Sequence, residues 1–121
     1  MKLKERTPPR RFAVGHKGRE IHLSHVADIE LAADEQITLT APGGREYDIV
    51  RKSWGYYATP SLNGRLRQFG LRSALVASGE RRYLLLVEED RMAEFEAYIA
   101  AQSMRVIAWL DGDTLNLTSA S

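Results

Sequence analysis

The run Arg82-Tyr83-Leu84-Leu85-Leu86-Val87-Glu88 decides the predicted fold, because a strand built from it is apolar on both faces. Such a strand lies in the middle of a sheet and is covered on both sides. Residues 90–102 follow with the apolar spacing of a helix, and residues 105–110 form a second run that is apolar on both faces. This strand–helix–strand order predicts a right-handed crossover that joins two parallel strands near the C-terminus.

Two β-hairpins and a short helix are predicted around this region. Residues 36–53 alternate apolar and polar side chains on either side of the Pro42-Gly43-Gly44 turn, which is the pattern of a half-buried hairpin. Residues 71–88 form a second hairpin around Ser78-Gly79-Glu80. Between the hairpins, Thr59-Pro60 opens a helix that ends before Gly70, since threonine favours a helix start and glycine a helix end.

Together these elements predict an α+β fold in one domain. We expect a mixed, mostly antiparallel sheet of five or six strands with two helices, one of which lies in the crossover. Residues 36–41 are expected at an exposed edge of this sheet. A length of 121 residues fits a single domain, which we place at residues 12–113. Residues 1–11 are predicted to be a disordered basic arm, because Thr7-Pro8-Pro9 opposes a helix, and residues 114–121 a C-terminal tail.

The composition excludes several classes of chemistry. The chain has no cysteine, so disulfides, thiolate zinc sites and cysteine nucleophiles are absent. Its N-terminus has charge but no apolar run behind it, and its longest apolar runs are far too short to span a bilayer. We therefore expect a cytoplasmic protein without a membrane partner.

The net charge of +1 conceals four blocks of alternating sign. Residues 1–19 carry seven cations and one anion, and residues 20–44 carry five anions and no cation. Residues 45–82 carry eight cations and three anions, and residues 83–121 carry two cations and seven anions. Such blocks pair within one fold or between copies, which makes a protein–protein interaction module or a homodimer one alternative function. Single-stranded nucleic acid binding is another alternative because the first block is basic, but the acidic blocks disfavour it.

The segment Lys52–Arg65 is the candidate binding site. It combines three aromatic residues with hydroxyl, amide and cationic side chains, and no single helical or strand period explains it. Free N–H groups at a helix start and a neighbouring arginine suit a phosphate or a carboxylate, and tyrosine rings provide flat surfaces for a sugar, a base or a peptide side chain. The predicted ligand-binding residues are Arg51, Trp54, Tyr56, Tyr57, Thr59, Ser61, Asn63 and Arg65.

The predicted function is therefore binding of an anionic ligand, such as a phosphorylated metabolite, a nucleotide sugar or an acidic peptide. In the opposing interpretation, Trp54 and one of the two tyrosines belong to the core, and Arg65 pairs with an acidic block.

No residue pattern predicts catalysis, a metal site or a cofactor. His16, His22 and His25 lie within ten residues of one another, but His22 and His25 point to opposite faces of a strand. The sequence has no His-Glu-x-x-His motif, calcium loop, nucleophile elbow, phosphate-binding loop or dinucleotide fingerprint. We therefore expect a domain that binds a ligand rather than transforming it.

Overall fold

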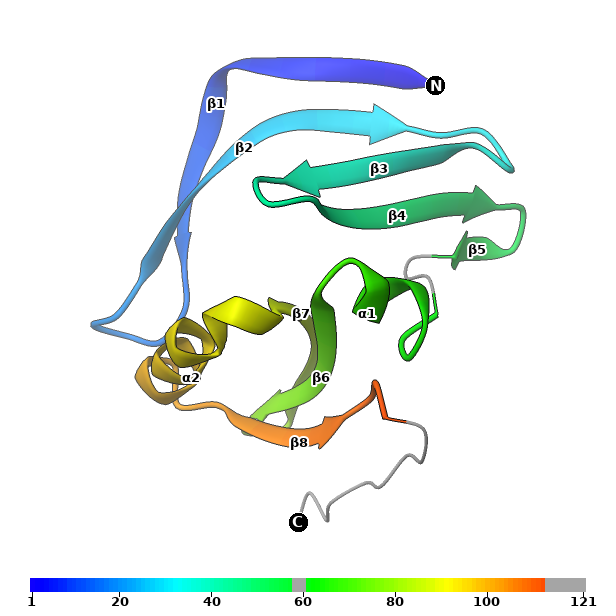
Figure 1. Cartoon of the computed structure of the whole chain (residues 1–121). Coiled ribbons are helices and arrows are strands. Elements are labelled where there is room, and N and C mark those ends of the chain that lie inside the picture. Colours follow the sequence, from blue (N-terminus) through cyan, green and yellow to red (C-terminus); the bar gives the residue numbers. More distant parts are fainter. Residues whose placement is uncertain (58–60, 113–121) are drawn as a thin grey trace.

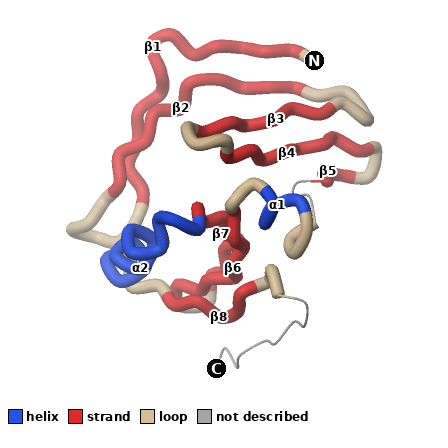
Figure 2. The backbone as a smooth tube through the Cα atoms, in the orientation of Figure 1, coloured by secondary structure: helices blue, strands red, loops and turns tan. Residues whose placement is uncertain are grey.

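The computed structural model describes residues 1–57 and 61–112, and these are mostly strands (Figure 1). The strands are β1 (Lys2–Val14), β2 (Ile21–Glu30), β3 (Gln36–Ala41), β4 (Arg45–Lys52), β5 (Gly55–Tyr57), β6 (Leu71–Ser78), β7 (Arg81–Glu88) and β8 (Arg105–Trp109). The helices are α1 (Arg65–Gln68) and α2 (Met92–Ala101), and a 3-10 turn over Glu89–Arg91 precedes α2. Figure 2 shows how small the helical share of the chain is.

Within the described residues the strands form three separate antiparallel sheets, with the orders β1-β2, β3-β4-β5 and β7-β6-β8. The hairpins predicted over residues 36–53 and 71–88 are confirmed as β3–β4 and β6–β7. The helix predicted over residues 90–102 corresponds to the 3-10 turn and α2. β3 pairs on one side only, so residues 36–41 form an edge strand as expected.

The predicted α+β fold, with one mixed sheet of five or six strands and a crossover, is wrong. In residues 1–57 and 61–112, eight strands lie in three small sheets with two short helices, and β7 does not pair with β8. β6 lies between β7 and β8 and is antiparallel to both. It takes this central place because it buries small and apolar side chains, among them Ala74, Val76 and Ala77. The apolar faces identified β7 and β8 as strands, but they did not determine which strand lies beside them.

The predicted disordered arm is also wrong, because residues 2–14 form β1 and pair with β2. The register shifts between Glu5 and Arg10, and the prolines lie within this irregular stretch. Pro8 and Pro9 have no N–H group to donate, so the ladder is interrupted there and resumes afterwards. The prolines therefore oppose a helix without preventing a strand. The predicted tail over residues 114–121 lies outside the described residues.

The helix predicted from Thr59-Pro60 to Gly70 is shorter than expected. Residues 62–64 form a turn, and α1 begins at Arg65, whose backbone N–H donates to Ser61 Oγ at 2.8 Å. The predicted helix start, Thr59-Pro60, lies outside the described residues. Gly70 has a φ of 74°, which fits its expected place just after the helix. Among the described residues, no helix is long and apolar enough to cross a membrane.

The buried apolar side chains lie in the C-terminal half of the chain. They are Leu66, Leu71, Ala74, Val76, Ala77, Val87, Ile107 and Ala108. On this half α2 adds Phe95, whose ring meets the Trp109 ring of β8 edge-on with centroids 5.9 Å apart. In residues 1–57, by contrast, the one buried residue is Asp48. The core therefore sits around β6, and the N-terminal strands lie outside it.

Candidate functional site

The two faces of the β3–β4 hairpin differ in polarity. Ile37 lies opposite Ile49 and Leu39 lies opposite Tyr47, so strand alternation places these four side chains on one face. Thr38 and Asp48 form the pair between them and point to the other face. The sequence thus builds one apolar face and one polar face, as the alternation predicted.

The polar face holds the one buried residue of this hairpin, Asp48. Asp48 accepts hydrogen bonds from Arg65 Nε at 2.7 Å and from Thr38 Oγ1 at 2.8 Å. The hydrogen bond from Arg65, followed by that from Thr38, lowers the pKa of the Asp48 carboxyl below its ordinary value, although burial opposes this shift. The Arg65 guanidinium also lies over the ring of Phe69, 4.7 Å from its centroid. Through Arg65, α1 therefore covers Asp48, while Thr38 and Thr40 on the same face stay exposed.

The apolar face is partly open to solvent, because Ile37, Tyr47 and Ile49 are only half-buried. Leu39 is 50% exposed, although strand alternation predicted that it would be buried. A hollow of about 610 Å³ lies on this face, and β2 contributes Ile29 to its lining while β5 contributes Tyr56. Leu39 and Tyr47 continue this face beside a smaller hollow of about 250 Å³, which Leu71 and Leu86 also line. We call the whole surface the open face, and its residues are Ile29, Ile37, Leu39, Tyr47, Ile49 and Tyr56. The hairpin thus covers a carboxylate and exposes its leucine, which is the reverse of the usual arrangement.

The predicted ligand-contacting groups Arg65, Ser61 and Arg51 already have partners within the chain. Arg65 pairs with Asp48, and Ser61 Oγ accepts the backbone N–H of Arg65. Arg51 donates from Nη1 to the carbonyl oxygen of Gly55 at 2.8 Å. The expected geometry, in which Arg65 faces an incoming anion beside free amides, is therefore not present.

The aromatic residues of this segment are exposed rather than part of a core. Trp54 is 71% exposed, Tyr56 60% and Tyr57 51%. Asn63 lines a separate hollow with Arg67, and Thr59 lies outside the described residues. Of the seven predicted residues that the structure describes, Arg51 and Tyr56 line one hollow together, and this hollow belongs to the open face.

The histidines and the N-terminal cations do not assemble into a site. Within residues 1–57 and 61–112, no group of three or more metal-ligating side chains is present. His25 Nε2 lies 3.0 Å from Asp28 Oδ1, and Arg6 Nη2 lies 2.7 Å from Asp28 Oδ2. Lys2 pairs with Glu30 at 3.7 Å. Two cations of the predicted nucleic-acid arm are thus already beside carboxylates, which weakens the motive for that function.

The open face is the feature that sequence analysis did not anticipate. The alternation of residues 36–41 correctly identified an apolar face, but a face is buried only if another element covers it. The sequence did contain an indication of an uncovered face, because two predicted helices are too few to cover the apolar sides of several strands. No protein-family model, curated protein or solved structure matches this chain, so the functional argument rests on the geometry of the site.

Proposed function

We propose that this chain is a protein–protein interaction module that pairs with a second copy of itself through the open face. The observation that carries the proposal is the β3–β4 hairpin, in which Asp48 on the polar face is buried against Arg65 while Leu39 on the apolar face is half exposed beside a hollow. A small sheet needs its apolar face packed against another element for stability. Exposed apolar surface with polar neighbours is typical of interaction sites.

A second copy suits this surface for two reasons. Most soluble oligomers are symmetric dimers in which the same patch of each copy meets, so an apolar face is complementary to itself. The hollow on the open face also carries one cation, Arg51, and one anion, Glu30. A two-fold axis can place the cation of one copy near the anion of the other. Two such sheets pack face to face at about 10 Å.

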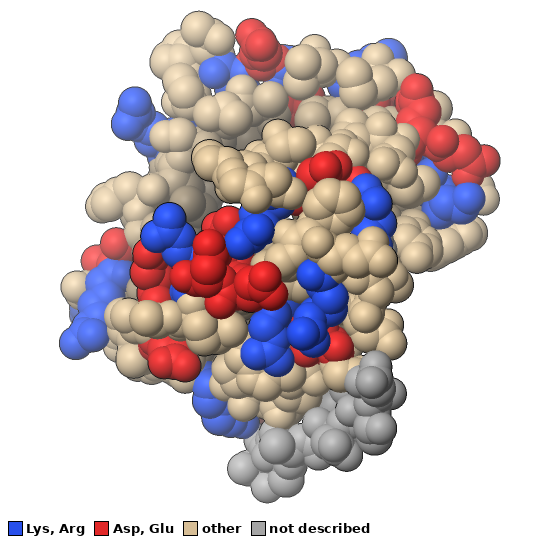
Figure 3. All heavy atoms as spheres, viewed as in Figure 1, with Lys and Arg blue, Asp and Glu red and all other residues tan. Residues whose placement is uncertain are grey.

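The charge blocks do not drive this association, because they pair within the chain. Arg6 pairs with Asp28, Lys52 with Asp34, and Arg72 with Asp111. Figure 3 shows acidic and basic side chains lying beside one another on the visible face rather than in separate fields. We therefore expect apolar burial to hold the dimer together, and salt to weaken it little.

Sedimentation velocity over a concentration series tests the proposal with two neighbouring substitutions. Leu39→Glu places a charge on the open face, whereas Thr40→Glu places the same charge on the opposite face of β3. We expect dimers for the wild type and for Thr40→Glu, at low and at high salt, and monomers for Leu39→Glu. Circular dichroism establishes that both variants keep the fold of the wild type.

Three results would contradict the proposal. The first is a wild type that stays monomeric at every concentration. The second is a Leu39→Glu variant that dimerises as the wild type does. The third is equal loss of association in Leu39→Glu and Thr40→Glu, which would show that the added charge weakens association equally from either face of β3.

Anion binding at residues 51–65, which the sequence favoured, is supported less well by this geometry. Arg65 already has a carboxylate partner, and Ser61 already has a backbone partner. An anion at this place would have to displace Asp48 from Arg65, which leaves a buried carboxylate unpaired. The exposed rings of Trp54 and Tyr57 fit an interaction surface beside the open face instead.

A further inference from the structure

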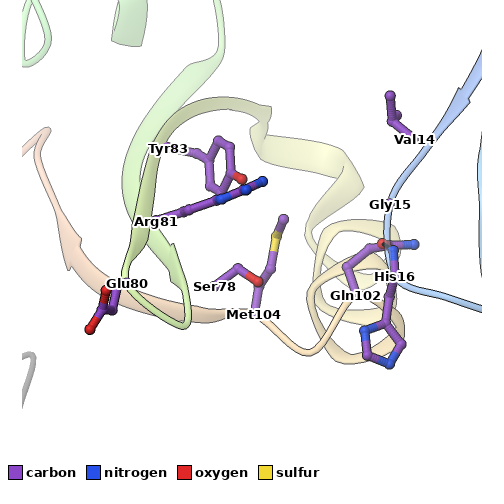
Figure 4. A pocket seen from close by; sticks show the side chains of 9 residues that line it. All are labelled: Val14, Gly15, His16, Ser78, Glu80, Arg81, Tyr83, Gln102 and Met104. Atoms are coloured by element: carbon purple, nitrogen blue, oxygen red, sulfur yellow. Dashed lines mark hydrogen bonds between the residues drawn. The ribbon is translucent and has the colours of Figure 1, made fainter.

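A second hollow, separate from the open face, has a volume of about 930 Å³ (Figure 4). One wall is the chain that leaves β1 at Val14, and the other is the β6–β7 hairpin. Met104, just after α2, forms part of the floor. A volume of this size is typical of sites for small molecules, which range over about 300–1,000 Å³.

The β6–β7 hairpin directs three polar side chains to this hollow. Arg81 lies opposite Ser78 in the ladder, and Tyr83 follows two residues later on the same side of β7. In Figure 4 the Arg81 and Tyr83 side chains lie side by side and extend into the space, and Met104 rises toward them. Glu80 lies at the rim and points away from Arg81 in this view.

Arg81 differs from Arg45, Arg65 and Arg72 in its partners, and of the two arginines at the start of β7, Arg81 and Arg82, it is the one that lines this hollow. Arg65 pairs with Asp48, and Arg72 pairs with Asp111. Arg45 pairs with Glu88. The Arg81 side chain, by contrast, makes no hydrogen bond or ion pair with any described residue. A guanidinium at the edge of a hollow, with all its donors free, is suited to a carboxylate or a phosphate.

We propose that this hollow binds a small organic anion in which a carboxylate or phosphate monoester is attached to a flat, apolar body. The Arg81 guanidinium donates to the anion, and the Ser78 hydroxyl adds a further donor. The Tyr83 ring and the Met104 side chain contact the apolar body. This site is independent of the open face, because it uses neither β3 nor β4.

Calorimetric titration with four probes tests this site. The probes are benzoate, phenyl phosphate, benzyl alcohol and inorganic phosphate, which separate the anion from the aromatic body. We expect saturable one-site binding of benzoate or phenyl phosphate, and weaker binding of the other two. The stronger of the two aromatic anions identifies the headgroup that the site prefers.

Neighbouring arginines of β7 supply a matched pair of variants. Arg81→Gln should weaken binding of the aromatic anion by about tenfold or more, which is the usual effect of losing a charge-assisted hydrogen bond. Arg82→Gln removes the same charge from the opposite face of β7 and should bind as the wild type does. Tyr83→Leu should weaken the aromatic anions while leaving inorganic phosphate unchanged.

The proposal is overturned if none of the four probes binds saturably. It is also overturned if Arg81→Gln binds as tightly as the wild type, or if both arginine variants lose affinity equally, since that pattern reports net charge alone. Thermal unfolding without ligand shows whether each variant is folded. The same titration on Leu39→Glu separates this site from the open face, because binding here should survive that substitution.

Discussion

The β7-β6-β8 sheet and the β3-β4-β5 sheet each have three antiparallel strands, but they differ in what covers them. In the first, Val76 is completely buried, and α1 lies against β6 with Leu66 completely buried. In the second, Leu39 is half exposed, and α1 offers the charged side chain of Arg65 instead. The short helix α1 thus packs Leu66 against the β7-β6-β8 sheet and pairs Arg65 with the β3-β4-β5 sheet. The covering element, rather than the strand pattern, decides which sheet has a core.

The largest effect that separates the two regions should come from one substitution made in both. Leu66→Ala removes a completely buried side chain and should lower the free energy of unfolding by about 2–5 kcal/mol. Leu39→Ala removes the same atoms from the open face and should change this free energy by only about 0.5 kcal/mol in the monomer. Urea unfolding of dilute protein measures both. Equal losses at the two positions would mean that Leu39 is packed as tightly as Leu66, and the comparison would fail.

Much of the local structure was predictable from the sequence, because it depends on neighbouring residues. The Pro42-Gly43-Gly44 turn and the alternation around it predicted the β3–β4 hairpin, and Gly70 marked the end of α1. The arrangement of strands was not predictable in this way. β7 and β8 are both apolar on two faces, and nothing in either run shows that β6 lies between them. Strand order depends on contacts between distant segments, which a local pattern does not record.

The candidate site was predictable only as a segment with unusual composition. Arg65 was expected to be free, but its partner Asp48 lies 17 residues away on another element. The aromatic residues were singled out by composition alone, and that composition did not show whether they would be exposed, as the structure has them. The open face and the hollow lined by Arg81 both form where separate elements meet. A single stretch of sequence therefore contains no pattern that predicts either of them.

The contact between α1 and the β3–β4 hairpin should make stability depend on pH. The pKa of Asp48 is lowered in the folded protein, chiefly by Arg65, so its contribution to stability is complete above the ordinary carboxyl pKa of about 4. This contribution is lost as the pH falls from there toward the lowered pKa. Asp48→Asn should therefore cost about 1–3 kcal/mol at neutral pH and much less in acid.

Urea unfolding of the wild type and Asp48→Asn at neutral and acidic pH measures this difference. Asp34→Asn is a suitable control, because Asp34 is an exposed carboxylate that also pairs with a cation, Lys52. We expect Asp34→Asn to have little effect at either pH, as exposed ion pairs contribute about 0–1 kcal/mol. A cost for Asp48→Asn that does not change with pH would contradict the role assigned to its charge.

The smallest effect should come from the buried side chain that ties β1 and β2 to the C-terminal half. Gln102 Oε1 accepts the backbone N–H of His16 at 2.7 Å, and Gln102 Nε2 donates to the Arg19 carbonyl oxygen at 2.9 Å. Gln102→Ala should lower the free energy of unfolding by about 1 kcal/mol and speed hydrogen exchange at the His16 amide. Gln68→Ala, at an exposed glutamine of α1, should do neither. Unchanged exchange at His16 would show that the turn between β1 and β2 is held by contacts other than Gln102.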